Sequence, residues 1–487
     1  MTFWLSLVCA GVAWGGGGGE EPAAPKAPAP IDVVAAFEGV LADVIARTES
    51  SVVAIHRDRD DNAGETLAVR GKSRPRADAE MRIARARMLD EEAISFDFGS
   101  GVVVGDDGEI LTAFHVVKGA SRLVVRAAGR QAFEAEVIAA DPRSDLAVIV
   151  PVAGPGLPKP QLKPIPLGDA ATLRKGSFLV TLGNPFNAAM QDGRANASWG
   201  ILSNVARRVV YDGEVDSMGR RVVQLPHYPT LLQLDSKLNL GMSGGAVVNL
   251  KGELVGLVTT AASPAGFDAM AGYAFPIDRM GRRAVETLKE GREVEYGLLG
   301  IRQSAGFNAN GGGSNRIDSV SPNSPAALGD LQRDDVIVAV DGVPVHDFSS
   351  LIVAVSAFAP GEKVRLKVLR DGRELEKTLV LAKFPVDGEI IATVRPPAWR
   401  GVRVDHRSLL IAAQLGGDEP GPVAQGVAVR EVEPGSPADK AGLKPWLTIR
   451  SVGDRPVNDP ADFARAVAEL KGPVRLMTDL GPITVGP

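Results

Sequence analysis

Residues 232–260 read LQLDSKLNLGMSGGAVVNLKGELVGLVTT, in which two apolar runs flank a glycine-rich turn. The turn carries Ser243, with Gly241 two residues before it and a glycine pair, Gly244 and Gly245, directly after it. Glycine and serine are ordinary turn formers, so this stretch taken alone favours a tight hairpin between two strands. A serine whose neighbours lack side chains can also be a nucleophile, because the backbone N–H groups around it can face a developing oxyanion. A choice between the two requires a base, an orienting acid and a scaffold elsewhere in the chain.

The sequence around this turn is typical of an all-β domain. From residue 96 onward, short apolar runs such as GVVV, RLVVRA and LAVIVPV recur about every eight to twelve residues, separated by Gly, Asp and Pro. This spacing predicts a β-barrel or sandwich rather than β–α–β units. Helical apolar spacing occurs at 31–50 and 278–290, and the charged, irregular residues 57–95 predict a long mobile insertion.

The C-terminal part of the chain contains an internal repeat. Residues 319–355 align without gaps on residues 431–467, and both copies carry the triplet SPA. Two copies of one small module are therefore predicted. In each copy SPA opens a short helix, with serine at the N-cap and proline at the first helical position. A strand and a turn follow, and then an amphipathic helix, whose inner face carries Leu351 and Val355 in one copy and Phe463 and Val467 in the other.

This order of elements resembles the PDZ domain, as do the segments GLLGI and RGVRV ahead of the two copies. The resemblance implies that the loops binding the terminal carboxylate of a peptide are Leu299-Gly300-Ile301 and Arg400-Gly401-Val402. The peptide would add as a strand to the sheet edge. The alternative is a pair of small β-rich interaction modules without a peptide groove.

Composition limits the classes of function. Among 487 residues the formal net charge is −5, which gives no reason to expect nucleic acid as a partner. The single cysteine, Cys9, allows no intrachain disulfide, and the five histidines form no HExxH motif, so neither a metal nor a cofactor is expected.

The N-terminus is typical of an export signal. The apolar run at 3–14 is shorter than the roughly 20 residues of a membrane span and suits the apolar region of a signal peptide. A lipoprotein signal at Cys9 and a mis-assigned start codon are the alternatives. The Gly-, Pro- and Ala-rich residues 15–30 predict a flexible tether. Membrane association is expected only if this N-terminus is retained as an anchor.

A base and an acid for Ser243 are found upstream. The segment ILTAFHVV places His115 at the end of a predicted strand, and DPRSDLAVI places Asp145 between a turn and a strand. The order His-Asp-Ser is that of chymotrypsin-like double β-barrels, in which the first barrel supplies His and Asp and the second supplies Ser. The fold class predicted for the chain is therefore mainly β, with such a double barrel followed by two PDZ-like α/β modules.

The segments GSGVVV, ILTAFHVV, DPRSDLAVI, LGNPF, LNLGMSGGAVVNL and GYAFPID together resemble the HtrA family of serine proteases. The resemblance implies a trypsin-like protease domain over 31–292 and PDZ domains over 296–385 and 398–487, with 1–30 as signal peptide and tether. It also implies a homotrimer, for which residues 31–50 are the candidate contact.

The resemblance gives each site residue a role. Ser243 would be the nucleophile, His115 its base and Asp145 the acid that orients the imidazole, and the N–H groups of Gly241 and Ser243 would form the oxyanion hole. The family commonly has NRGNSGG where this chain has NLGMSGG, so Leu240 and Met242 replace polar residues.

Specificity follows less directly from the sequence. Leu238 would line the wall of the S1 pocket, which favours small or aliphatic side chains. Lys237 lies six residues before the nucleophile, where trypsin-like enzymes keep their S1 determinant, and would favour acidic side chains. The alternative for Lys237 is a solvated or ion-paired side chain, because apolar pockets tolerate an unpaired ammonium badly.

The function expected from these observations is that of an exported, periplasmic, ATP-independent serine endopeptidase that degrades unfolded or damaged envelope proteins. The PDZ modules would bind peptide C-termini or extended segments. Two alternatives stay open, namely a catalytically latent chaperone or scaffold with the same fold, and a regulatory protease that cuts one signalling substrate.

Overall fold

A computed structural model describes most of the chain. The described residues are 29–58, 98–154, 159–190, 192–207, 231–262, 271–303, 315–385, 390–409 and 426–487. The predicted signal peptide, nearly all of the tether and, from residue 59 on, the predicted insertion lie outside these ranges, as does Cys9.

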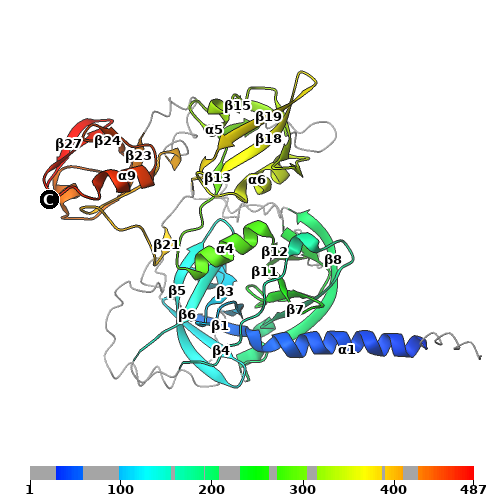
Figure 1. Cartoon of the computed structure of the whole chain (residues 1–487). Helices are drawn as coiled ribbons and strands as arrows, with labels where there is room; N and C mark the ends of the chain where they lie inside the picture. Colours follow the sequence, from blue (N-terminus) through cyan, green and yellow to red (C-terminus); the bar gives the residue numbers. More distant parts are fainter. Residues whose placement is uncertain are drawn as a thin grey trace, which may run out of the picture.

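Six antiparallel strands form the first barrel (Figure 1). They are β1 (Val52–Asp58), β2 (Phe98–Val103), β3 (Ile110–Ala113), β4 (Arg122–Ala127), β5 (Gln131–Asp141) and β6 (Leu146–Pro151). The order is β5-β4-β1-β2-β3-β6, and pairing of β5 with β6 closes the sheet. Apolar side chains such as Ile55, Ile110, Leu123 and Ile149 are buried inside, as the alternating pattern of the strands requires.

The second barrel is also closed. Its strands are β7 (Phe178–Gly183), β8 (Asn196–Arg207), β9 (Leu231–Leu234), β10 (Ala246–Asn249), β11 (Leu254–Ala262) and β12 (Ala271–Pro276), in the order β10-β11-β12-β9-β8-β7. The turn that carries Ser243 joins β9 to β10, so the glycine-rich stretch does connect two strands. The predicted double barrel is confirmed.

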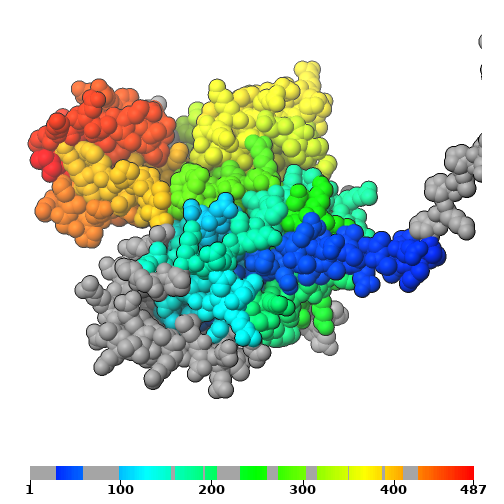
Figure 2. Space-filling model, turned by 60° about the horizontal axis from the view of Figure 1, so that its bottom comes forward, coloured from blue at the N-terminus to red at the C-terminus, as the bar shows by residue number. Residues whose placement is uncertain are grey.

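One helix precedes the double barrel in the chain and another follows it, as predicted. Helix α1 (Pro30–Thr48) buries Leu41, Val44 and Thr48 against it, and its first half extends beyond the body of the domain (Figures 1 and 2). Helix α4 (Arg279–Lys289) is capped at its N-terminus by Asp278, whose side chain accepts a hydrogen bond from the Gly281 N–H at 2.9 Å. None of the helices within the described ranges is long and apolar enough to cross a membrane.

Two smaller β-rich modules follow. The first contains β13 (Gly297–Leu298), β14 (Ile301–Gln303), β15 (Ile317–Val320), α5 (Pro325–Leu328), β16 (Val336–Val340), β17 (Val343–Pro344), α6 (Phe348–Ser356), β18 (Lys363–Arg370), β19 (Arg373–Val380) and β20 (Ala382–Lys383). The second contains β22 (Val402–His406), β23 (Val427–Val432), α8 (Pro437–Lys440), β24 (Thr448–Val452), β25 (Arg455–Pro456), α9 (Pro460–Val467), β26 (Val474–Thr478) and β27 (Gly481–Val485). Figure 2 shows them as two lobes beside the double barrel.

The local predictions for the repeat are confirmed. The Ser324 hydroxyl accepts a hydrogen bond from the Ala327 N–H at the start of α5, and Ser436 does the same for Asp439 at the start of α8. The predicted inner faces of the two longer helices are buried, with Leu351 and Val355 on α6 and Phe463 and Val467 on α9.

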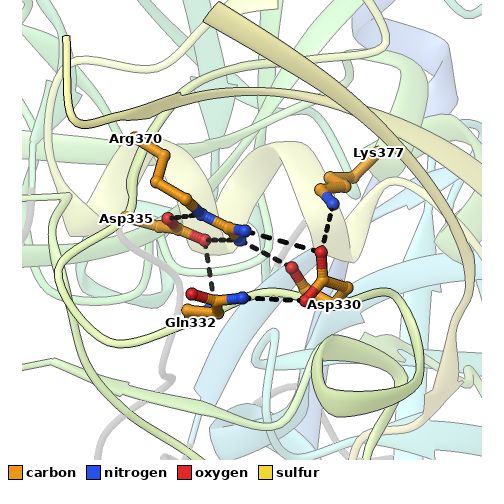
Figure 3. A network of polar contacts seen from close by, with 5 residues as sticks. All are labelled: Asp330, Gln332, Asp335, Arg370 and Lys377. Carbon is orange, nitrogen blue, oxygen red and sulfur yellow. Dashed lines mark hydrogen bonds and ion pairs between the residues drawn. The ribbon is translucent and has the colours of Figure 1, made fainter. Parts of the chain in front are cut away.

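The first module also contains a polar network (Figure 3). Arg370 on β18 donates to both oxygens of the buried Asp335, at 2.7 and 2.8 Å, and Lys377 on β19 donates to Asp330 at 2.6 Å. The hydrogen bond from Lys377 is the main cause that lowers the pKa of Asp330 to about 2. In the second module the positions of Asp330 and Asp335 are occupied by Gly442 and Leu447, which have no carboxylate. The ion pairs that hold the β18–β19 hairpin therefore have no equivalent there.

A short strand, β21 (Ile391–Ala392), connects the two modules and was missed by the sequence pattern. It pairs antiparallel with the end of β5, with Ile391 opposite Ala140 and Ala392 opposite Ala139. The segment between the modules therefore returns to the first barrel, close to the loop that carries Asp145.

A buried lysine holds the junction of the three parts. The Nζ of Lys383, at the end of the first module, lies 2.9–3.0 Å from carboxylate oxygens of Glu293, Glu295 and Asp405. Burial alone would lower the pKa of Lys383, but the three carboxylates outweigh burial and raise it. Because Asp405 belongs to β22, this ion group fastens the second module to the first.

The change Lys383→Met is expected to lower the free energy of unfolding by about 3 kcal/mol, because it leaves the nearly buried Asp405 without a cation. Thermal unfolding at pH 7 measures the loss. The control is Lys377→Met, whose partner Asp330 is 61% exposed, so a much smaller loss than in Lys383→Met is expected there. Equal melting temperatures for the two variants would contradict the role of Lys383.

Candidate active site

His115 and Asp145 are in direct contact in the first barrel. Strand β3 ends at Ala113, and the chain turns at once into a single helical turn, α3 (Phe114–Val117), so His115 lies on that turn and not at the end of the strand. Its Nδ1 lies 2.7 Å from Oδ2 of Asp145, and its backbone N–H donates to Oδ1 at 2.9 Å. The Phe114 N–H also donates to the backbone carbonyl of Asp145, at 2.9 Å. These contacts hold the carboxylate and the imidazole in one orientation.

The charge of Asp145 controls the proton affinity of the imidazole. Desolvation lowers the pKa of His115, but the charge of Asp145 and its hydrogen bond outweigh desolvation, so the pKa is raised above its ordinary value. Arg57 opposes this rise, and it also donates to the His115 carbonyl at 2.8 Å. The histidine side chain remains 48% exposed, so its Nε2 side is open to a reacting group.

Thr259 on β11 connects Ser243 to this pair. Its hydroxyl donates to Oδ2 of Asp145 at 2.7 Å, and its carbonyl accepts from the Ser243 hydroxyl at 3.0 Å. Thr259 thus contacts both Ser243 and Asp145, and Asp145 in turn contacts His115. The Ser243 hydroxyl must leave the Thr259 carbonyl to reach the imidazole, and hydrogen bonds of this kind commonly tighten only when substrate is present. The sequence did not single out Thr259, because nothing in LVTT distinguishes it from Thr260.

The loop at 240–243 has a defined peptide orientation, because each of its four carbonyls accepts a hydrogen bond. The donors are the Phe186 N–H to Leu240 (2.8 Å), the Ser100 hydroxyl to Gly241 (2.7 Å), the Gly245 N–H to Met242 (2.8 Å) and the Ser100 N–H to Ser243 (2.8 Å). In a trans peptide the N–H points away from the carbonyl. The N–H groups of Gly241 and Ser243 therefore point away from these donors, and neither has an acceptor within the residues that the structure describes.

Only glycine fits at Gly241. Its φ is +94°, and a Cβ there would lie 2.3 Å from the Asn184 carbonyl oxygen. Gly244 is similar, since its φ is +81° and a Cβ would lie 2.1 Å from the Ser100 carbonyl oxygen. Gly241 and Gly244 are thus required by the packing of this loop against the turn after β7 and against β2 of the first barrel.

Comparisons with known proteins agree with this arrangement. A family model described as a trypsin-like peptidase domain matches residues 99–257, and a PDZ domain model matches residues 297–381. The periplasmic pH-dependent serine endoprotease DegQ of Escherichia coli K12 is 30% identical over 388 residues, which cover 78% of this chain and 77% of that protein. The chain belongs to the HtrA family of serine endoproteases. 

Other relatives of this HtrA-family chain have the same character. The periplasmic serine endoprotease DegP of E. coli K12 is 29% identical over 399 residues, covering 80% of this chain and 75% of that protein. A probable DegP-like periplasmic serine endoprotease of Chlamydia muridarum is 29% identical over 396 residues, covering 79% and 73%. A solved HtrA-type protease, AlgW with a tripeptide, matches with a TM-score of 0.49 at 23% identity, over 71% of this chain and 98% of that one. The chain is a serine endopeptidase.

The two departures from the common HtrA pattern have different surroundings. Met242 is 3% exposed and packs in an apolar cluster of the second barrel that includes Leu238 and Val258. Leu240 is 70% exposed, and its backbone carbonyl accepts a hydrogen bond from the Phe186 N–H. Met242 thus anchors the loop from inside, whereas the Leu240 side chain lies on the surface beside it.

The two residues predicted to define S1 point in different directions. Leu238 is buried and packs against Gly272, where a Cβ would lie 2.5 Å from Leu238 Cδ1. Lys237 is exposed, and its N–H donates to the Ser198 hydroxyl at 3.2 Å. The structure therefore does not bring Leu238 and Lys237 together.

The predicted PDZ loops both contain a glycine in the left-handed region. Gly300 (φ +79°) lies just before β14 and packs on Ser324, and Gly401 (φ +85°) lies just before β22 and packs on Ser436. The carbonyls of Leu299 and Gly300 accept hydrogen bonds from Ala326 and Ser321.

The second loop is more strongly tied to its own module. The Arg400 guanidinium donates to the carbonyls of Leu470, Gly472, Val485 and Gly486 at 2.7–3.1 Å, and the Val402 N–H donates to the Trp399 carbonyl. Arg400 therefore braces the module, and its charge is already engaged. The corresponding residue of the first loop is Leu299, whose apolar side chain cannot form such hydrogen bonds.

Proposed function

We propose that this chain hydrolyses exported polypeptides that expose extended segments, with Ser243 as the nucleophile. The observation that carries the proposal is the geometry of the loop at 240–243, in which every carbonyl is held and two N–H groups are left for an oxyanion. This arrangement supports an active protease rather than the latent scaffold with the same fold. A latent enzyme would instead be expected to have a carbonyl turned into the site where the oxyanion forms.

The chemical steps follow from the contacts. The Ser243 Oγ attacks the scissile carbonyl carbon, and Nε2 of His115 accepts the hydroxyl proton and later donates it to the leaving amine. Asp145 accepts the Nδ1–H hydrogen bond and stabilises the imidazolium while it exists. The N–H groups of Gly241 and Ser243 bind the oxygen of the tetrahedral intermediate. Water then hydrolyses the acyl-enzyme through the same groups.

The substrate class is inferred from the PDZ modules and from the relatives. Strand addition beside β14 in the first module or β22 in the second needs an extended segment, and folded proteins rarely expose a free edge. Of the two, the first module is the better candidate, because Arg400 in the second is engaged. The relatives named above are described as periplasmic, which supports export of this chain as well.

We also propose that the protease domain forms a homotrimer through α1. Phe37 on α1, Phe178 on β7 and Trp199 on β8 form an aromatic cluster with centroid distances of 5.0–6.0 Å, although Phe178 and Trp199 are 41% and 52% exposed. Ile31, Val33 and Val34 of α1 are more than half exposed as well. Exposed apolar side chains gathered in this way are typical of a subunit contact.

The double change Phe178→Ala and Trp199→Ala is expected to convert a trimer into a monomer in light scattering after gel filtration. The control is Trp446→Ala, since Trp446 is 51% exposed and belongs to the second module, which lies away from α1 (Figure 1). A wild-type protein that elutes as a monomer, or a double variant that stays trimeric, would contradict the proposed contact.

Degradation of casein by the purified protein tests the protease proposal, together with labelling by a fluorophosphonate. Labelling is expected on Ser243, and casein is expected to be cut without ATP. A peptide with a free hydrophobic C-terminus should raise the rate if the PDZ modules regulate the site, and an unchanged rate would restrict them to tethering. Failure of both cleavage and labelling would favour the scaffold alternative.

A further inference from the structure

We propose that Ser100 is a positioning residue that keeps the oxyanion loop of the second barrel in its catalytic orientation. Ser100 belongs to β2 of the first barrel and is completely buried. It lies 141 residues before Gly241 in the chain, so no local pattern connects the two. The inference rests on the proposed function, because it assigns Ser100 a role in the reaction of Ser243.

The hydroxyl of Ser100 has two partners, and they determine its direction. The Asn184 N–H, 2.8 Å away, can only donate, so the hydroxyl oxygen must accept there. The single hydroxyl proton is therefore donated to the Gly241 carbonyl, at 2.7 Å. A residue that supplies both an acceptor and a donor at this point cannot be replaced by an apolar one without leaving two buried groups unpaired.

The backbone of Ser100 also forms hydrogen bonds to the loop that carries Ser243 and to β3. Its N–H donates to the Ser243 carbonyl at 2.8 Å, and its carbonyl accepts from the Thr112 hydroxyl at 2.6 Å. Ser100 thus holds carbonyls on both sides of Met242, the residue between the two proposed oxyanion donors. Thr112 lies on β3, which leads directly into the turn that carries His115, so Ser100 also connects the base to the loop.

The side-chain bond matters because of Gly241 itself. A glycine is free to adopt φ and ψ values that other residues cannot, so local sterics do not fix the peptides on either side of it. The Gly241 carbonyl is held by the Ser100 hydroxyl, and the preceding Leu240 carbonyl is held by Phe186. Phe186 lies in the turn that begins after Asn184, whose N–H is the other partner of Ser100. Loss of this hydroxyl therefore loosens the peptide that follows Gly241, and it leaves the Asn184 N–H without its acceptor beside the turn whose Phe186 holds the peptide that presents the Gly241 N–H.

The test is Ser100→Ala, assayed on fluorescently labelled casein in the full-length protein. We expect kcat to fall by about 30-fold, less than the hundredfold or more for loss of an oxyanion donor, with KM changed by less than about twofold. The rate constant of fluorophosphonate labelling should fall in proportion to kcat/KM. The acidic limb of the pH profile should not move, because His115 and Asp145 are untouched. Ser100→Cys, which keeps a weak donor, should lie between alanine and wild type.

Thr181→Val provides the matched control. Thr181 is a buried hydroxyl of the second barrel that donates to the Ser198 carbonyl at 3.2 Å, so the variant loses a buried hydrogen bond away from the loop. A kcat loss in Ser100→Ala that Thr181→Val does not share, at equal thermal stability, supports the positioning role. Wild-type kcat in Ser100→Ala beside an inactive Ser243→Ala would overturn it while leaving the nucleophile assignment in place.

Discussion

The change Ser243→Ala is expected to lower kcat on casein by about 10⁵- to 10⁶-fold, the size of loss that follows removal of a serine nucleophile. The hydroxyl supplies the attacking oxygen, and no neighbouring group can replace it, because the Thr259 hydroxyl is committed to Asp145. The change removes one hydroxyl oxygen and no other contact, so KM should change little. Casein degradation assays measure the loss of kcat, and fluorophosphonate labelling should be lost as well, because it requires the Ser243 hydroxyl.

The structural cost of this change should be small. Among the described residues, the Ser243 side chain makes one hydrogen bond, to the Thr259 carbonyl, and such a bond contributes about 1 kcal/mol. Ser236→Ala is a suitable control, because Ser236 lies in the same connection, is 6% exposed and has a hydroxyl without a hydrogen-bond partner in the part of the chain that the structure describes. Full activity is expected for that control. Residual hydrolysis within about tenfold of wild type in Ser243→Ala would refute the assignment of the nucleophile.

Much of the fold could be predicted from the sequence because its signals are local. The spacing of apolar runs indicates strands. The SPA triplet occurs twice, each time followed by a predicted helix, which indicates a duplicated module. Side-chain caps such as Ser324 and Asp278 satisfy backbone groups only three residues away, so short patterns are enough to find them. The same is true of the left-handed Gly241, whose neighbours in the sequence already indicate a tight turn.

The connections between distant segments could not be predicted in this way. Periodicity indicates which face of a strand is buried but not which segment covers it. The contacts of Thr259 with Asp145, of Ser100 with Gly241 and of β21 with β5 each join residues more than a hundred positions apart. Lys383 is similar, since a lysine in a charged linker is ordinarily solvated. Only the fold shows that three carboxylates surround it.

The region before Asp145 shows why these connections matter for function. Arg143 is buried, stacks between the rings of Tyr296 and Phe384 at 4.1 and 4.2 Å, and donates to the Ser356 hydroxyl at the end of α6. Helix α6 is the helix beside which a peptide would lie in the first PDZ module. The loop that carries the proposed catalytic acid is therefore packed directly on the first PDZ module, and the two are not independent parts.

The change Asp145→Asn is expected to lower kcat by about 10⁴-fold, because it disturbs the tautomer of His115. Within the described residues, the Asp145 carboxylate accepts three hydrogen bonds, from the His115 backbone N–H, from the imidazole and from the Thr259 hydroxyl. An asparagine must place its NH₂ group against one of these donors. If it faces Nδ1, the imidazole becomes protonated on Nε2 and cannot accept the proton of Ser243.

The pH profile separates this electrostatic role from a structural one. In the wild type Asp145 raises the pKa of His115 against desolvation, so the acidic limb of kcat/KM, which reports the neutral base, lies above the ordinary histidine value. Asparagine removes the negative charge but leaves His115 desolvated, so the pKa of His115 should fall. The acidic limb of the pH profile of the residual activity should therefore move to lower pH. Asp278→Asn is the matched control, because asparagine caps α4 as well as aspartate does, and it should change neither kcat nor the limb. A limb that stays in place or moves to higher pH in Asp145→Asn would mean that Asp145 does not act on the proton affinity of His115.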